Sequence, residues 1–403
     1  MQFAFLILLV FHILVCFYLI YPFILYCLQV FNRKVKNNIE DNFKNEADYA
    51  IIVTAYEQTT LIPSVVESIL KLNYENFLVY IVADNCDVSE LNFSDNKIIV
   101  LRPEEVLASN VRSHFYAINN FKRAHDRLTI IDSDNLVHPA YLNELDSIFS
   151  SGYKAVQGVR KAKNLNTQYA CLDEAGDIYY RFIDRKLLFG AGSSASLAGS
   201  GMAFTTNIYV DCMQDKQSGG AGFDKVLQFE LLTKGERIAF AEEVIVYDEK
   251  TAKTDQLVKQ RARWINTWFK FFLLGLKLFF KSLKNLNLNQ FLFSLMLLRP
   301  PLFILLFLCG LLGLTDIFFF QSFLPVILIS VIAFVYIFFK ALSYFKAPDK
   351  IYTSLKTAPK FIFYQVIALF KAKNANKLSV ATKHEEYLNT VNVNDVENEK
   401  HQN

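Results

Sequence analysis

Apolar residues are concentrated towards the two ends of this chain, with a stretch of mixed character between them. Residues 1–31 contain no lysine, arginine, aspartate or glutamate, and this run exceeds the roughly 20 residues that cross a bilayer. A second apolar block, 297–339, is long enough for two spans, with Asp316 near its middle as the expected exposed turn. The pattern predicts three membrane-spanning helices. A cleaved leader is the less favoured alternative for the first, because leaders carry an N-terminal charge and a shorter apolar core.

Between these blocks, short apolar runs alternate with helical patterns. Strands are expected at 50–53, 77–82, 97–101 and 128–131, and helices at 61–72 and 111–121. Such alternation is typical of an α/β fold with a mainly parallel sheet. Because ligands of open parallel sheets bind where the strands end, we expect a site at the carboxyl ends of these strands.

A third kind of pattern follows the mixed stretch. Lysines recur at helical spacing between phenylalanine and leucine residues over 268–284. This predicts an amphipathic helix in the membrane interface, and 352–373 carries a weaker version of the pattern. A helix pair packed on the soluble domain is the alternative. The polar residues after Thr382 predict a disordered tail.

Composition and charge narrow the class of protein. The chain has 403 residues, of which 53% are hydrophobic, and a formal net charge of only +3, so charge gives no case for a nucleic-acid partner. None of the six cysteines forms a CxxC pair, and neither a zinc site nor a disulfide framework is indicated. The stretch between the apolar blocks is therefore expected in a reducing cytosol.

Basic residues border both apolar blocks and set the expected orientation. They are Arg33, Lys34 and Lys36 after the first block, Arg299 before the second, and Lys340 and Lys346 after it. Positive charge marks the cytoplasmic side and is attracted to anionic lipids. We therefore expect a multi-pass protein of the cell (inner) membrane, with its N-terminus outside and its central domain cytoplasmic.

Aspartates mark the ends of two expected strands. Asp132 and Asp134 follow 128–131 directly. If that strand continues, residues two apart share a face, so both carboxylates can bind one Mg²⁺ or Mn²⁺ together with substrate phosphates. Asp84 ends a strand where an aspartate can accept a hydrogen bond from a base or ribose. Solvated turns are the alternative at both places.

Three further candidates lie in the second half of the mixed stretch. The small residues 199–202 let a backbone approach a ligand closely, or form a flexible loop. Asp224 precedes a helical run, as a general base or as a helix cap. Gln260, Arg263 and Trp264 share a helix face, where arginine suits phosphate oxygens and indole suits a sugar. Basic residues snorkelling beside lipid are the alternative reading.

In this order the motifs resemble those of membrane-bound family 2 glycosyltransferases of the inverting, metal-dependent type, which are related to polysaccharide synthases. The resemblance covers about 48–268. Its elements are Thr54-Ala55-Tyr56-Glu57, Val82-Ala83-Asp84-Asn85, Asp132-Ser133-Asp134-Asn135, Gly199-Ser200-Gly201-Met202, Asp224, and Gln260-Arg261-Ala262-Arg263-Trp264. The spacing of the last element after Asp132-Ser133-Asp134 is the most specific feature.

The resemblance implies a fold and a set of roles. The fold would be the α/β, Rossmann-like GT-A fold of nucleotide-diphospho-sugar transferases. The uridine pocket would be lined by Thr54, Tyr56, Glu57 and Asp84. Asp132 and Asp134 would bind the diphosphate through Mg²⁺ or Mn²⁺, and Asp224 would be the base. Diphosphate and acceptor would be contacted by Gln260, Arg263 and Trp264.

The sequence departs from the family pattern in places. Phe223 stands where the Glu-Asp base motif has its glutamate, which makes Asp248 and Glu249 the alternative carboxylates. The usual Pro-Ala-Tyr-Asn-Glu opening reads Thr-Ala-Tyr-Glu-Gln, with its glutamate displaced by one position. Arg112 lies near where relatives place a basic residue before a helix.

These predictions combine into one organisation and one activity. The expected segments are a transmembrane helix at 1–31, a cytosolic glycosyltransferase domain at 32–267, an interfacial helix at 268–290, two transmembrane helices at 291–345, and an interfacial helix with a polar tail at 346–403. The activity would be transfer of a sugar from a UDP-sugar to a lipid-linked or glycan acceptor, beside membrane lipids. A processive synthase, completed by a homo-oligomer or partner subunit, and a non-catalytic nucleotide-sugar-binding subunit are the alternatives.

Overall fold

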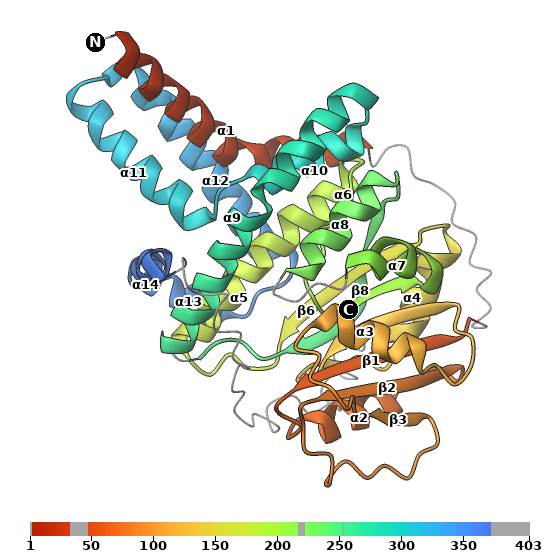
Figure 1. Ribbon diagram of the computed structural model, residues 1–403. Coiled ribbons are helices and arrows are strands. Elements are labelled where there is room, and N and C mark those ends of the chain that lie inside the picture. Colours follow the sequence, from red (N-terminus) through yellow and green to blue (C-terminus); the bar gives the residue numbers. More distant parts are fainter. Residues whose placement is uncertain (1, 33–46, 217–221, 253, 372–403) are drawn as a thin grey trace. The chain divides into compact units, whose positions relative to one another are not determined.

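A computed structural model describes residues 2–32, 47–216, 222–252 and 254–371, which form two compact units (Figure 1). The sheet unit holds the described residues of Ile39–Glu174 and Ser196–Gln256. The helical unit holds those of Met1–Asn38, Ala175–Ala195 and Leu257–Ala375. Lys36 and its basic neighbours, and the expected tail after Thr382, lie outside the described residues.

An eight-stranded mixed sheet is the centre of the sheet unit, in the order β3-β2-β1-β4-β7-β6-β8-β5. The strands are β1 Tyr49–Tyr56, β2 Phe77–Asp84, β3 Ile98–Leu101, β4 Arg127–Asp132, β5 Leu136–Val137, β6 Ala155–Ala162, β7 Met202–Thr205 and β8 Ile238–Asp248. Strands β3, β2, β1 and β4 are parallel neighbours, and so are β6 and β8. Strand β7 runs antiparallel to both β4 and β6, and β5 to β8.

Burial explains why the first strands form. Ile51, Ile52, Val53, Val79 and Ile81 are at most 1% exposed, and a strand covered on both faces is a continuous β-branched run rather than an alternating one. The four strands predicted from such runs are confirmed as β1 to β4, and so is the α/β class. The expectation of a mainly parallel sheet holds for this half only, because β7 inserts antiparallel beside β4.

Five helices belong wholly to the sheet unit. They are α2 Ile62–Leu70, α3 Asn110–Asn119, α4 Tyr141–Ser150, α7 Thr206–Met213 and α8 Phe223–Thr233. The predicted helices 61–72 and 111–121 are confirmed as α2 and α3. Helix α3 packs on β1 and β2, and α4 packs on β6 and β8. The side chain of Ser109 caps α3 by accepting a hydrogen bond from the amide of Arg112, which fixes where that helix begins.

The helical unit gathers segments from three parts of the sequence. Its elements are α1 Gln2–Asn32, the π-helix η2 Phe182–Leu187, α6 Leu188–Gly190, α10 Leu288–Leu298, α11 Leu302–Phe318, α12 Leu324–Tyr344, α13 Asp349–Ser354 and α14 Ala358–Lys371. Helices α5 Gln168–Arg181 and α9 Thr254–Asn285 each belong partly to both units. The segment 175–195 thus interrupts what the sequence analysis treats as one domain over 32–267.

Two described helices are long and apolar enough to cross a membrane, Leu6–Asn32 and Gln321–Tyr344. Helices α10 and α11 pass the same test only as a pair, and they bend by 69° at the break between them. The break contains Pro300 and Pro301, and proline lacks the amide hydrogen that would continue a helix. Two spans follow from length and composition, or three if the bent pair is one span.

Asp316 corrects one expectation. It was predicted to be an exposed turn, but its side chain is fully buried in the last turn of α11. There it accepts from His12 Nε2 of α1, which lies 3.0 Å from Oδ1 and 3.2 Å from Oδ2. The turn between the two helices comes later, after Phe318. An ionisable pair tolerates an apolar setting when each partner satisfies the other, so the carboxylate faces the helix bundle.

Candidate functional site

Polar residues meet at the carboxyl ends of three neighbouring parallel strands, β2, β1 and β4 (Figure 1). In the strand register Tyr56 of β1 lies beside Asp84 of β2, and Thr54 of β1 lies beside Asp132 of β4. Glu57 follows β1 directly, and its amide donates to the carbonyl of Asp84 at 3.2 Å. The structure therefore brings all five residues to one edge of the sheet, where ligands of such sheets bind.

Asp84 connects this edge to the loop before α3. Its carboxylate is 2% exposed and accepts hydrogen bonds from the backbone amides of Leu107 at 2.8 Å and Ala108 at 2.7 Å. Arg112 reaches back into the same loop, donating from Nη1 to the carbonyl of Leu107 at 2.8 Å. Two amides on one carboxylate fix the loop firmly. Asp84 thus shapes this edge, and its contact with a nucleotide stays a prediction.

The backbone around Asp84 is held in an unusual conformation. Glu57, Asn85 and Ala108 have φ values of 61°, 53° and 47°, in the left-handed region that residues with a Cβ rarely adopt. Each such residue costs on the order of 1 kcal/mol. These three residues lie around the carboxylate of Asp84, at the ends of β1 and β2 and in the loop before α3. The surrounding structure imposes their conformation, as it does at binding sites.

The two aspartates after β4 are carried by a turn. The strand ends at Asp132, and the amide of Asn135 donates to the carbonyl of Asp132 at 3.0 Å. The condition that the strand continues through Asp134 is therefore not met. Asn135 Nδ2 lies 3.2 Å from Asp134 Oδ1, and Lys163 Nζ lies 2.5 Å from the carbonyl oxygen of Asp134. A turn can also direct two carboxylates at one cation, because their backbone is fixed on both sides.

The small-residue stretch 199–202 supports this turn. Ser200 is buried, and its Oγ accepts from the amide of Asp132 at 3.1 Å. Gly201 donates to the carbonyl of Ile130, and it has a φ of 65°. A Cβ there would lie 3.0 Å from Cγ2 of Val246. Conformation and space both require glycine here, so the stretch is a fixed support of the Asp132 turn rather than a flexible loop.

Charged residues that the sequence analysis did not select surround the same support. Arg160 donates to the carbonyl of Ala198 at 2.7 Å and to Asp248 Oδ2 at 2.6 Å. Lys250 Nζ lies 3.1 Å from Asp248 Oδ1 and 2.9 Å from Glu174 Oε2. The available signal is the basic run 160–163, which begins in the last three residues of β6, after its buried part. Asp248 is thus held by two cations, which disfavours it as a proton acceptor.

Asp224 lies in the first turn of α8, after Gly222 in the left-handed conformation with φ 95°. The N-cap residue of this helix is Gly222. The Asp224 side chain is 16% exposed, with Lys225 Nζ 3.1 Å from Oδ2. Lys225 also donates to the carbonyl of Leu197 at 3.3 Å. Asp224 is therefore not the N-cap residue, and its role as a base stays a prediction.

Gln260, Arg263 and Trp264 lie on α9, in the helical unit. Helix α9 packs through Val258, Ala262 and Ile265 against α11 and α14. At 3.6 residues per turn, the three candidates occupy the opposite face. Trp264 is 51% exposed, and the guanidinium of Arg261 lies 4.2 Å from the centre of its ring. Burial lowers the pKa of Arg263 from its ordinary value.

A metal would fit the turn after β4 only with help from a substrate. Among the described residues, no three His, Cys, Asp or Glu side chains gather closely enough to hold an ion by themselves. Two carboxylates are suitable protein ligands for Mg²⁺ or Mn²⁺, because these ions take their remaining oxygen ligands from phosphates and water. Asp132 and Asp134 supply that donor set.

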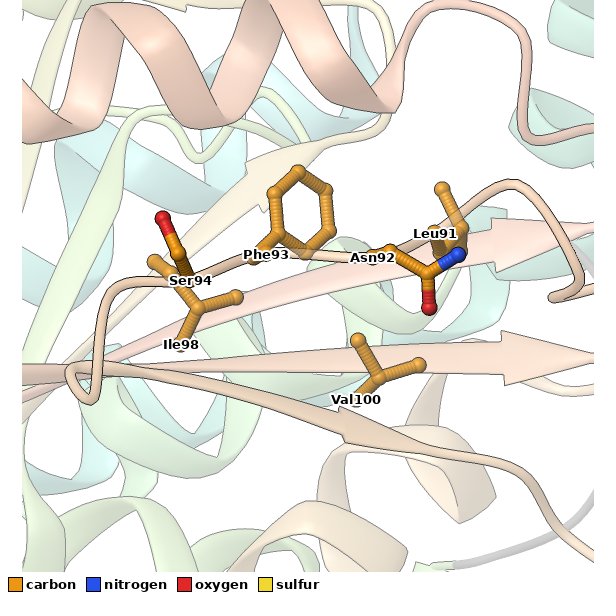
Figure 2. Close-up of a pocket in the computed structure, with 6 residues that line it drawn as sticks. All are labelled: Leu91, Asn92, Phe93, Ser94, Ile98 and Val100. Atoms are coloured by element: carbon orange, nitrogen blue, oxygen red, sulfur yellow. The ribbon is translucent and has the colours of Figure 1, made fainter.

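A separate hollow of about 390 Å³ lies against the edge strand β3 (Figure 2). Its lining combines Ile98 and Val100 of β3 with the loop residues 91–94. Figure 2 shows Phe93 and Leu91 above the strand, with Ile98 and Val100 facing them. None of the predicted site residues lines this hollow.

Comparison with solved structures and families shows the fold and the family of the chain. The structure titled "Mannosyltransferase PcManGT from Pyrobaculum calidifontis in complex with GDP-Man and Mn2+" is similar with a TM-score of 0.54 and 13% identity, over 91% of this chain and 99% of that one. The fold is the GT-A fold of nucleotide-sugar transferases. The profile described as "Glycosyltransferase like family 2" matches residues 47–267, and the chain belongs to this family.

Two other comparisons add nothing to that assignment. S. aureus TarS has a TM-score of 0.38 and 12% identity, over 62% of this chain and 55% of that one, which is too low a similarity to inform the fold. No curated protein sequence matches the chain. The fold class predicted from sequence is confirmed, and so is the resemblance to family 2 glycosyltransferases in its broad form.

Proposed function

We propose that the chain is a metal-dependent, inverting glycosyltransferase that moves a hexosyl group from a UDP-sugar to a membrane-associated or glycan acceptor. The observation that carries the proposal is the meeting of Thr54, Asp84 and Asp132 on adjacent parallel strands, with Asp134 in the turn that follows. The GDP-Man and Mn²⁺ bound to the similar mannosyltransferase support a nucleotide sugar and a divalent ion. A GDP-sugar is therefore the first alternative donor to test.

The donor end of the site has distinct parts. Thr54, Tyr56 and Glu57, with the loop held by Asp84, form the nucleoside side in this proposal. Asp132 and Asp134 would hold Mg²⁺ or Mn²⁺, and the ion would supply positive charge against the diphosphate. The turn is pre-organised by Ser200 and Lys163, so little reorganisation is needed when the donor binds.

The transfer itself is a single displacement. An acceptor oxygen attacks the sugar C1 while the bond from C1 to the diphosphate oxygen breaks, and the bonding electrons leave with the diphosphate. The hydroxyl proton passes to the carboxylate of Asp224, whose Oδ2 lies 3.1 Å from Lys225 Nζ. Configuration at C1 inverts because there is one displacement. Gln260, Arg263 and Trp264 contact diphosphate and acceptor in this scheme, and an aromatic face suits a sugar ring.

Two other functions have specific observations behind them. A processive synthase needs a channel, and the described residues supply two spans, or three with the bent pair, so a partner subunit or a homo-oligomer would have to complete it. A non-catalytic binding subunit is supported by Phe223, which replaces the family glutamate. A single transfer to a lipid-linked or glycan acceptor requires neither a partner nor the missing glutamate.

The testing experiment uses the full-length chain in membranes. Radiolabelled UDP- and GDP-sugars are supplied to wild type and Asp224→Asn, and both nucleotide release and labelled product are measured. We expect release with wild type and a loss of about 10²- to 10⁴-fold with Asp224→Asn, as when a general base is removed. Equal release from both would remove the assigned base. Donor binding without any release would favour the binding subunit.

A further inference from the structure

Three ring side chains, two of them buried, join α3, α7 and the first residue of α8. His114 of α3 and Tyr209 of α7 are fully buried, and His114 Nδ1 lies 2.6 Å from the hydroxyl of Tyr209. The His114 ring also meets Phe223 edge to face, with ring centres 5.2 Å apart and an angle of 68° between the planes. Phe223 directly precedes Asp224. The position that departs from the family pattern therefore packs on a buried histidine.

The contact joins uncharged groups. Burial lowers the pKa of His114 to about 3 and raises the pKa of Tyr209 above its ordinary value. Both side chains are thus neutral near pH 7. Nε2 of His114 makes no hydrogen bond in the described structure, so the contact with Phe223 is one of ring packing, in the edge-to-face arrangement that aromatic pairs favour.

These rings lie between the loop that binds Asp84 and the helix that carries Asp224. Helix α3 begins at Asn110, directly after the loop whose amides bind Asp84. Helix α8 begins at Phe223, and its N-cap Gly222 has no capping side chain. The packing of Phe223 on His114 is therefore a specific side-chain contact that sets where the first turn of α8 lies relative to α3.

We infer that His114 and Phe223 are positioning residues, which hold the first turn of α8 and thereby orient Asp224 for proton transfer from the acceptor. The inference rests on the proposed function. One ring of this neutral pair, Phe223, directly precedes Asp224 in the chain. Tyr209 fixes the orientation of the His114 ring, and Phe223 transmits that orientation to the next residue.

Four variants test the inference: His114→Leu, Phe223→Leu, the double variant, and the conservative His114→Phe. The matched control is Phe121→Leu, which removes a ring that packs on His125 and Tyr80 in the same unit. For each, kcat is measured per donor-binding site, with donor KM and thermal unfolding. Because only protein that binds donor is counted, a lower kcat cannot result from a smaller amount of folded protein.

The expected result is a loss in kcat with little change in donor binding. His114→Leu and Phe223→Leu each lower kcat about tenfold while donor KM stays within about twofold, since small misplacements of a catalytic group slow the reaction step. The double variant loses no more than the worse single variant, because both remove one contact. His114→Phe keeps a ring and retains most of kcat, and Phe121→Leu lowers the melting temperature only.

The results that would contradict the inference can also be told apart. If the two leucine variants melt earlier but turn over at the wild-type kcat, the rings are structural only and the inference is wrong. A failure of the proposed function looks different, because Asp224→Asn would then be as active as wild type. If Asp224→Asn is inactive while His114→Leu and Phe223→Leu are fully active, the positioning role is wrong but the proposed function stands.

Discussion

Asp248 and Asp224 illustrate how surroundings separate two carboxylates that sequence alone leaves as rival bases. Asp248 is 3% exposed and is bound by Arg160 and Lys250. Among the described residues, Asp224 forms an ion pair with Lys225 only, and it lies in the first turn of a helix. Two fixed cations stabilise the ionised carboxylate and make it a weak proton acceptor, so the chemistry is expected at Asp224.

Substitution of Asp248 should therefore affect folding more than turnover. Asp248→Asn removes the carboxylate shared by the buried Lys250, which keeps Glu174, and the half-buried Arg160, and breaking a buried ion pair costs up to about 3–5 kcal/mol. We expect a clear loss in the free energy of unfolding, with donor turnover per folded molecule within about tenfold of wild type, well short of the loss at Asp224→Asn. If Asp248→Asn folds normally but loses turnover more than Asp224→Asn does, the base is Asp248.

A pH dependence of stability follows from His114. Its pKa is about 3 in the folded protein, below the ordinary value of about 6.5, because burial disfavours the charged ring. The unfolded chain then binds the extra proton first. The contribution of His114 is fully present above about pH 6.5 and falls by up to about 1.4 kcal/mol per pH unit as the pH drops towards 3.

Melting temperatures of wild type and His114→Phe across pH 4–8 check this. The difference between the two proteins should shrink, or change sign in favour of the variant, as the pH falls below about 6.5. A difference that is independent of pH would mean that the pKa of His114 is the same in the folded and unfolded protein, which would contradict the lowered pKa. His125 has a lowered pKa for the same reason, desolvation by burial, and it is common to both proteins.

At the scale of elements, the pair His12–Asp316 fastens α1 to α11. His12 Nδ1 also contacts the carbonyl of Leu8 at 2.8 Å, so both ring nitrogens have partners. Replacing either residue alone with leucine strands the other in an apolar bundle, at a cost of about 1–3 kcal/mol. We expect each single variant to melt earlier in detergent and the double variant to recover most of the loss. Additive losses in the double variant would contradict this pairing.

The sequence predicted those elements whose residues carry the signal locally. Strands β1 to β4 have continuous β-branched runs, and α3 has a capping serine, so each was found. Strand β7 begins within a glycine- and serine-rich stretch, and its pairing with β4 and β6 depends on residues far away in the chain. Asp316 was misplaced for a similar reason, because its partner His12 lies 304 residues earlier.

The same difference between local and long-range signals applies to the candidate site. Asp84, Asp132 and Asp134 were selectable because each follows an apolar run. Ser200, Arg160 and Lys163 act on that site through contacts with backbone carbonyls and amides, which no spacing rule encodes. The rings of His114 and Phe223 come from helices more than a hundred residues apart, and only the fold brings them together.

At the scale of the whole molecule, a domain that uses a soluble donor is joined to helices that suit a bilayer. The orientation predicted from basic residues places the donor site in the cytoplasm. A reporter fused after Lys36 should therefore be cytoplasmic in cells. Finding that reporter on the outer side would separate the sheet unit from cytosolic nucleotide sugars and would contradict the predicted orientation.

The most direct measurement of the central claim is calorimetric binding of UDP and GDP to the purified chain, with and without Mn²⁺. The matched variant is Asp132→Ala with Asp134→Ala, and Asp95→Ala on the loop before β3 is the control. Wild type and control should bind a nucleotide diphosphate at least about tenfold more tightly with the metal, which corresponds to about 1.4 kcal/mol. The double variant should lose that gain. Metal-dependent binding that survives in the double variant would contradict the assignment of this sheet edge as the donor site.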